Sequence, residues 1–96
     1  MAELKIVASI EVKKEYQAEI EKVFANLVPE TRKEAGNISY ELHVDTKNPL
    51  KYTFIEVWKS EEAIAIHNNT PHFAAFKDAI DGKINDLKID IIKKIL

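Results

Sequence analysis

Apolar and polar residues alternate at the start of the chain. The apolar residues at every second position are Leu4, Ile6, Ala8, Ile10 and Val12. A period of two places their side chains on one face of an extended segment. The pattern therefore predicts a β-strand with one buried face over residues 4–12.

The period changes to that of a helix between Glu15 and Glu34. The apolar positions of this segment are Tyr16, Ile20, Val23, Phe24 and Leu27, which form one stripe on a helix with a charged opposite side. Pro29 lies inside the segment, where its ring removes a backbone donor and clashes with the carbonyl four residues earlier. We expect the helix to end or kink near Val28, and a further turn over residues 30–34 stays open.

Two more strands follow this helix. Gly36 and Asn37 end the helix, and residues 38–44 then alternate between apolar and polar side chains. A short hairpin loop over residues 45–50 leads into a strand over residues 51–58. This third strand is apolar on both sides, with Tyr52, Phe54 and Trp58 on one side and Ile55 and Val57 on the other. Such a pattern is typical of a strand that is covered on both faces.

The second helical region is predicted to be bent or split. Ser60 is a suitable N-cap for a helix that carries apolar residues up to position 66. Asn69 weakens the helix, Thr70 is suited to cap a new one, and Pro71 fits its first position. A fourth strand is predicted over residues 87–91, where apolar and polar residues alternate again.

The predicted order is strand, helix, strand, strand, helix, strand, which is typical of an α+β, ferredoxin-like βαββαβ fold over residues 1–96 as a single domain. Its antiparallel sheet has the first and third strands in the centre and both helices on one face. The residues expected on the other face are Val7, Ile55, Val57 and Ile92. An apolar patch of this kind usually marks an interface, so we expect a homodimer with two sheets packed face to face. A monomer with one half-polar open face is the alternative.

Composition excludes several classes of function. The 96 residues carry 14 basic and 16 acidic side chains and a net charge of -2, which argues against nucleic acid as a partner. No apolar run is long enough to cross a membrane, and the N-terminal segment lacks signal-peptide character, so we expect a cytoplasmic protein. The absence of cysteine excludes thiolate nucleophiles, disulfides and iron–sulfur clusters, and two glycines leave no phosphate-binding loop.

Glu56 and His67 are the first candidates for chemistry. A period of two places Glu56 between the aromatic rings of Phe54 and Trp58, where desolvation raises the pKa of a carboxyl group. Both general bases and structural ion pairs occur in such surroundings, and the sequence favours neither. His67 lies on the apolar stripe of the second helix and is expected to face the sheet, where its imidazole would either reach the mouth of a pocket or form a buried structural contact. His67 and His72 are five residues apart with a proline between them, so we predict no metal site.

Several residues together resemble the antibiotic biosynthesis monooxygenase (ABM) family. They are the segment Ile10, Glu11, Val12 and Lys13, then Glu34, Ala35, Gly36 and Tyr40, and above all Glu56-x-Trp58 followed by Ser60, Glu62, Ala63, His67, His72 and Phe73. The chain is also similar to the small quinol monooxygenases of that group. The resemblance implies a dimeric α+β barrel with a pocket between each sheet and its own helices. It also implies oxidation of a small phenolic or quinol-like aromatic with O2 and no cofactor.

The resemblance also implies roles for individual residues. His67 would act as the base or bond to the substrate oxygen, Trp58 would stack on its ring, and Glu56 would orient the imidazole or another polar group. The wall of the pocket would be formed by Tyr40, Phe54 and Phe73. His72 would be a second proton-transfer group, or it would face solvent at the start of its helix. Burial of so large a ring also makes Trp58 typical of a core aromatic.

Other functions stay open within this resemblance. The haem-degrading relatives have an asparagine on the first strand, and Ala8 stands at that position here, which argues against haem breakdown. A non-catalytic dimeric binding module is one alternative. An isomerase of a small phosphorylated carbonyl compound is another, although Lys59 is the only obvious basic residue near the expected pocket.

Overall fold

A computed structural model describes residues 3–96. The elements, in chain order, are β1 (Leu4–Val12), a short 3-10 helix η1 (Lys14–Tyr16), α1 (Gln17–Arg32), β2 (Asn37–Val44), β3 (Lys51–Trp58), α2 (Glu61–His67), α3 (Pro71–Ile80) and β4 (Ile84–Ile92). None of the helices in the described part of the chain is long and apolar enough to cross a membrane.

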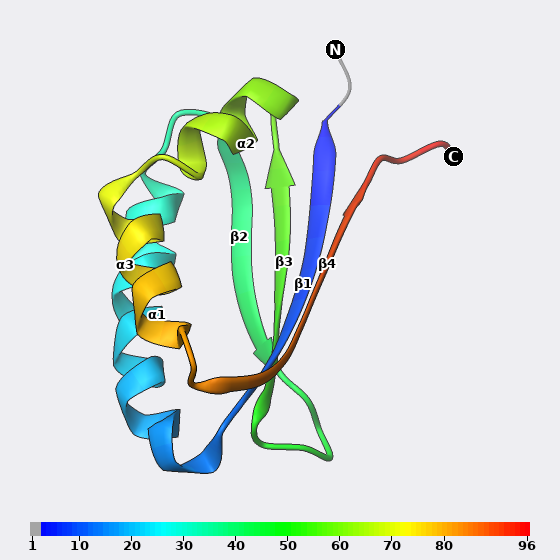
Figure 1. The fold of residues 1–96 in the computed structure, drawn as a ribbon. Helices are drawn as coiled ribbons and strands as arrows, with labels where there is room; N and C mark the ends of the chain where they lie inside the picture. The colour runs from blue at the N-terminus through cyan, green and yellow to red at the C-terminus, as the bar shows by residue number, and fades with distance from the viewer. Residues whose placement is uncertain (1–2) are drawn as a thin grey trace.

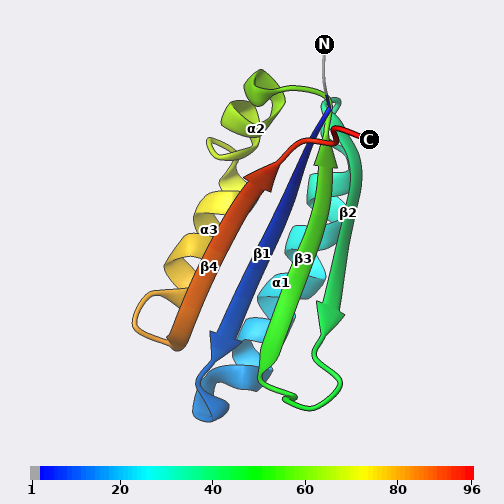
Figure 2. The same ribbon diagram turned by 90° about the vertical axis from the view of Figure 1, so that its right-hand side faces the viewer.

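The four strands form one antiparallel sheet in the order β2-β3-β1-β4. The three α-helices lie on one side of the sheet, and the other face is open (Figures 1 and 2). This arrangement confirms the predicted α+β ferredoxin-like fold with the first and third strands in the centre. The split of the second helical region is also confirmed, because α2 ends at His67 and α3 begins at Pro71.

Pro29 does not end the first helix near Val28, and of the outcomes left open the helix continues beyond the proline. Helix α1 runs through Pro29 as far as Arg32. Its buried stripe continues past the proline, since Ile20, Phe24, Leu27 and Thr31 all face the sheet. Packing of this stripe outweighs the cost of an interior proline, which is about 3 kcal/mol.

The fourth strand is longer than the alternation predicted. It pairs with β1 from Ile84, opposite Val12, to Ile92, opposite Lys5. Backbone pairing thus extends the strand at both ends beyond residues 87–91, because a ladder needs no apolar alternation to continue.

Strand β3 separates two different environments. On the helix side it buries Tyr52, Phe54, Glu56 and Trp58 in the core. On the open side, Val7 lies opposite Ile55, and Lys5 lies between Val57 and Ile92. The predicted division of β3 into two apolar faces is confirmed, and within this chain helices cover only one of them.

Side-chain caps and one glycine fix the position of α2. The Ser60 hydroxyl accepts a hydrogen bond from the Ala63 backbone N–H at 3.1 Å, as expected for the N-cap. Gly36 lies against the first turn of α2, where a Cβ atom would overlap the Cβ of Ala63. The absence of a side chain at residue 36 therefore lets α2 approach the turn between α1 and β2, which also carries Glu34.

Candidate functional site

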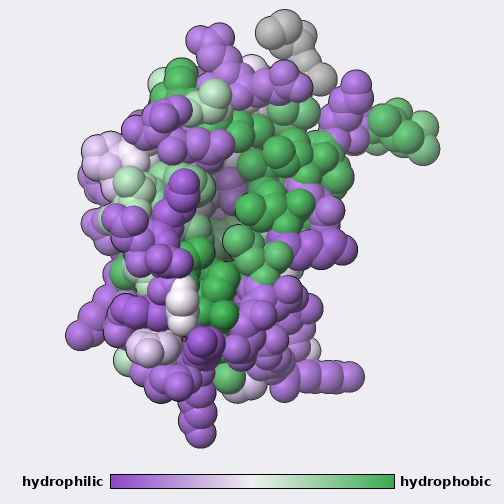
Figure 3. All heavy atoms as spheres, viewed as in Figure 1, coloured by the Kyte–Doolittle hydropathy of each residue, from purple (hydrophilic) through white to green (hydrophobic). Residues whose placement is uncertain are grey.

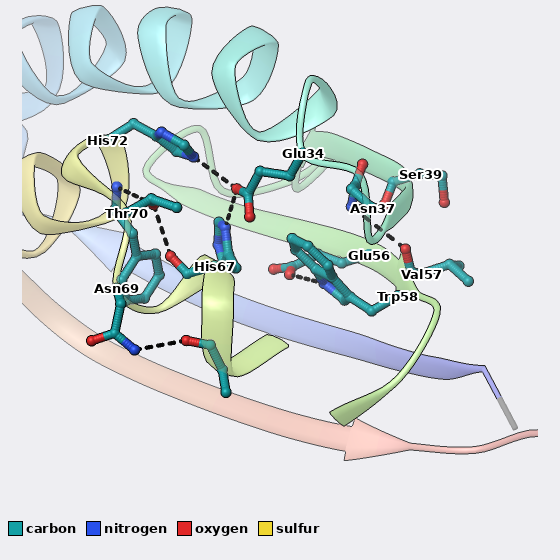
Figure 4. Close-up of polar contacts among 12 residues, drawn as sticks. Glu34, Asn37, Ser39, Glu56, Val57, Trp58, His67, Asn69, Thr70 and His72 are labelled. Carbon is teal, nitrogen blue, oxygen red and sulfur yellow. Dashed lines mark hydrogen bonds and ion pairs between the residues drawn. The ribbon is translucent and has the colours of Figure 1, made fainter. Parts of the chain in front are cut away.

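Two histidines and one carboxylate converge near the ends of α1, α2 and α3. The Oε2 atom of Glu34 lies 2.6 Å from Nδ1 of His67 and 2.7 Å from Nε2 of His72 (Figure 4). The side chains of Glu34 and His72 are 11% and 14% exposed to solvent, and the side chain of His67 is almost fully buried. We refer to Glu34, His67 and His72 as the histidine–carboxylate cluster.

Thr70 explains how two histidines five residues apart reach one carboxylate. Its hydroxyl donates to the His67 carbonyl at 2.8 Å and accepts from the Phe73 backbone N–H at 3.2 Å. The residue therefore ties the end of α2 to the start of α3 while the chain changes direction. Five residues would not place His67 and His72 on one face of a continuous helix, but here the two residues lie on separate helices.

The cluster offers three atoms of the kinds that bind transition metals, all within 4.8 Å of one another. Around a tetrahedral zinc ion, with bonds of about 2.0 to 2.1 Å, neighbouring ligand atoms are about 3.3 Å apart. The two nitrogen–oxygen distances, 2.6 and 2.7 Å, are instead those of direct charge-assisted hydrogen bonds. We therefore treat the cluster as a hydrogen-bonded one.

Glu56 and Trp58 form a second buried pair. The indole Nε1 of Trp58 donates to Oε1 of Glu56 at 2.8 Å (Figure 4). Glu56 is thus bonded to the indole of Trp58, whereas the imidazole of His67 is bonded to Glu34. The two pairs lie next to each other, since the rings of Trp58 and His67 are 4.6 Å apart between centroids.

Burial shifts the protonation of these groups in opposite directions. Desolvation raises the pKa of Glu56 to about 7, with the Trp58 N–H opposing the shift and the charge of Glu34 adding to it. Desolvation lowers the pKa of His67 below its ordinary 6.5, although the hydrogen bond and charge of Glu34 oppose it. Burial also raises the pKa of Tyr40. At neutral pH the imidazole of His67 is therefore neutral and able to accept a proton.

The other predicted wall residues differ in their position. Phe73 contacts His67 with a centroid distance of 4.8 Å, and Tyr40 contacts it at 5.7 Å. Phe54 is buried among Phe24, Tyr40 and Phe76, so it belongs to the core behind the site. The exposed His43 lies on β2, where its Nδ1 is 3.3 Å from the Thr53 carbonyl and outside the cluster.

A recess lies on the β4 side of the molecule, between the sheet and the helices (Figure 3). The side chains of Leu87, Ile89 and Ile91 face the helical side of the sheet and are 44%, 56% and 56% exposed. Helix α3 packs mainly on α1 and leaves this strip of β4 uncovered. Figure 3 shows the recess between the helical layer and an apolar band along β4. Half-buried Phe73 lies on the helical side.

Two overlapping clefts of about 400 Å³ and 410 Å³ lie elsewhere, between α1 and the outer strand β2. Their shared lining residues are Glu21, Leu42 and Tyr52. Neither cleft is lined by His67 or Trp58, so they are separate from the cluster.

A Glu56→Gln variant tests the raised pKa of this carboxyl group. Because the pKa in the folded state, about 7, exceeds the ordinary value of 4.5, Glu56 stabilises the fold below pH 4.5 and loses this contribution as pH rises through 7. The free energy of unfolding of the variant relative to the wild type should therefore increase by about 2 kcal/mol between pH 5 and pH 8. Urea denaturation at both pH values measures it, and a constant difference would show that Glu56 has an ordinary pKa.

Glu34 is the cluster residue that pattern reasoning did not single out. Among the sequence features, Glu34 is part of the Glu34-Ala35-Gly36 segment that resembles the family, and no role was predicted for it. The available signal was an acidic residue two positions before a glycine in the turn that faces α2, but nothing local to that turn indicates histidine partners 33 and 38 residues later.

Comparisons with known proteins agree with this fold. The family model described as "Antibiotic biosynthesis monooxygenase" matches residues 4–79. The chain is 36% identical over 69 residues to YcnE of Bacillus subtilis (strain 168), which is named as a candidate monooxygenase, with 72% of this chain and 73% of the relative covered. It is 31% identical over 78 residues to the "Probable quinol monooxygenase YgiN" of Escherichia coli (strain K12), with 73% and 75% covered. The crystal structure of PA3566 from Pseudomonas aeruginosa superposes with a TM-score of 0.93 at 28% identity, covering 100% of this chain and 97% of that one.

Proposed function

This chain belongs to the antibiotic biosynthesis monooxygenase family, and we propose that it oxidises a small phenolic or quinol-like aromatic with O2 and without a metal or organic cofactor. The observation that carries the proposal is the state of His67. Its Nδ1 is bonded to Glu34, while its Nε2 has no hydrogen-bond partner among residues 3–96. A neutral imidazole with one free nitrogen, held between aromatic rings, is suited to accept the proton of a phenolic hydroxyl.

The substrate itself supplies the electrons in this proposal. Once His67 has taken a hydroxyl proton, the electron-rich phenolate reduces O2, and the two combine into a peroxide at a ring carbon that bears hydrogen. The imidazolium returns its proton to the peroxide. The ring C–H proton then leaves as the O–O bond breaks, and the departing hydroxide combines with a proton to form water. One oxygen atom enters the product as a carbonyl, and four electrons pass from substrate to O2.

The recess beside β4 is the proposed route to His67, and because His67 is 2% exposed, a substrate reaches its imidazole only when neighbouring side chains move. An aromatic ring that enters it would contact Leu87, Ile89 and Ile91 on one side and Phe73 on the other. The apolar walls exclude water from the phenolate, which strengthens electrostatic interactions there and protects the peroxide from hydrolysis. This arrangement favours a flat, mostly apolar substrate with a few polar groups.

Oxygen consumption tests the proposed function. The purified protein, treated with EDTA and dialysed, is supplied with a panel of substituted hydroquinones and phenols in an oxygen electrode. We expect uptake above the buffer blank for at least one compound, and no change on removal of metal. Uptake equal to the blank for every compound would reject the monooxygenase and favour a binding module of the same fold.

We also propose that the open face of the sheet is the interface of a homodimer. Val7, Ile55 and Val57 form an apolar patch in its middle, which helices leave uncovered.

Ile55→Lys would place a charge in this patch. Sedimentation should give twice the 11.0 kDa chain mass for the wild type and the single mass for the variant. Val44→Lys is the matched control. Val44 is exposed but lies on the helical side of the sheet, away from the apolar patch, so this variant should stay dimeric. A wild-type protein of 11.0 kDa at micromolar concentration would contradict the dimer.

A further inference from the structure

The two imidazoles of the histidine–carboxylate cluster share one oxygen atom. Glu34 Oε2 lies within hydrogen-bond distance of His67 Nδ1 and of His72 Nε2. A carboxylate oxygen has two lone pairs and accepts two N–H donors, whereas a bare imidazole nitrogen at 2.6 to 2.7 Å would repel it. Each contact therefore requires a proton between nitrogen and oxygen.

This requirement determines which nitrogen of His67 is bare. When Glu34 is ionised, both protons belong to the histidines, so neutral His67 carries its proton on Nδ1. Its other nitrogen, Nε2, lies on the opposite edge of the ring and faces away from Glu34. An imidazole free in water prefers the reverse tautomer, with the proton on Nε2, in which the proposed base would be blocked.

We propose that Glu34 is the positioning residue that holds His67 in the Nδ1–H tautomer, and that His72 is the second N–H donor that keeps Glu34 in place. The proposal deepens the function proposed above and rests on it for its effect on turnover. A negative carboxylate also stabilises the imidazolium that forms when Nε2 accepts the substrate proton, as the aspartate of a Ser-His-Asp triad does.

The surroundings of Glu34 support this role. Its second carboxylate oxygen, Oε1, is buried and has no hydrogen-bond partner within the described chain. The two histidines are then the side chains that hold the carboxylate in place, and loss of either donor leaves a poorly satisfied buried charge. Its backbone is fixed by the turn, since its N–H donates to the Thr31 carbonyl at 3.0 Å and its carbonyl accepts from Asn37 at 3.1 Å.

Nitrogen-15 NMR of labelled histidine tests the proposal without any substrate. At pH 8, where His67 is neutral, we expect its Nδ1 to be protonated and its Nε2 to be bare in the wild type. Glu34→Leu removes the acceptor and should shift His67 toward the Nε2–H tautomer. Glu34→Gln keeps an acceptor oxygen and should retain the wild-type tautomer at least in part. Wild-type His67 with its proton on Nε2 would overturn the proposal, even if Glu34→Leu fails to fold.

Turnover measurements test the effect of this positioning. We expect Glu34→Leu to lower kcat at least about 10-fold, with partial rescue in Glu34→Gln. His72→Leu should lower kcat, while His72→Gln, which keeps an N–H donor, should stay near the wild type. His43→Leu is the control and should change nothing. If turnover is absent in the wild type but the tautomer is as expected, the proposed function fails and the positioning stands. Equal kcat in wild type and a folded Glu34→Leu would reject the positioning role.

Discussion

Replacing His67 with glutamine is expected to lower oxygen uptake with a quinol substrate by about 100-fold to 10,000-fold, the range typical of a lost general base. Glutamine keeps an N–H donor for Glu34 but accepts no proton at neutral pH. The result is measured as kcat after subtraction of the buffer blank. His43→Gln, at the exposed histidine outside the cluster, is the matched control and should behave as the wild type. A folded His67→Gln variant with wild-type kcat would exclude His67 as the base.

The activity is expected to depend on pH in one direction, because His67 acts as a base. The base must be neutral, and burial places the pKa of His67 below 6.5. Activity should therefore be at its plateau at neutral pH and fall as pH drops through that pKa. In His67→Gln the residual activity should lack this step.

Replacing Trp58 with alanine is expected to lower the free energy of unfolding by about 3 to 5 kcal/mol. The side chain is fully buried, with 0% exposure, and packs against Tyr40 and His67. The substitution leaves a large cavity and also removes the N–H donor of Glu56, a carboxyl group that is itself buried. Urea denaturation at pH 7 measures the loss.

Two controls give the Trp58 result its meaning. Trp58→Phe keeps most of the ring and should cost less than the alanine variant. Phe73→Ala, at a half-buried ring on the other side of His67, should also cost less. A loss below about 1 kcal/mol for Trp58→Ala would contradict its assignment to the core. Since the buried ring reaches a substrate only if neighbouring groups move, Phe73 is the better candidate for direct contact in the recess.

The fold could be predicted because each element carries its own periodic pattern. Alternation in β3 correctly placed Glu56 on the same side as Phe54 and Trp58, and the capping residues Ser60 and Thr70 correctly located the starts of two helices. Where the first helix ends could not be predicted from Pro29, because local propensity does not include the packing that continues beyond it.

The cluster could be predicted only in part, because its members meet through tertiary structure. The inward orientation of His67 followed from the helical stripe, and its burial at 2% exposure confirms it. Its partnership with Glu34 and His72 depends on the turn at Thr70 and on the close approach of α2 to Gly36. Neither contact produces a periodic pattern in the sequence, so no pattern favoured Glu34 over Glu56 as the partner of the imidazole.

Isotope tracing tests the central claim most directly. The wild-type protein is given a quinol that supports oxygen uptake under an atmosphere of 18O2, and the product is analysed by mass spectrometry. If His67 is the base of a monooxygenase, one heavy oxygen atom should appear in the product and the other in water. In His67→Gln this incorporation should be lost. A product without heavy oxygen, or incorporation that is the same in the variant and the buffer blank, would contradict it.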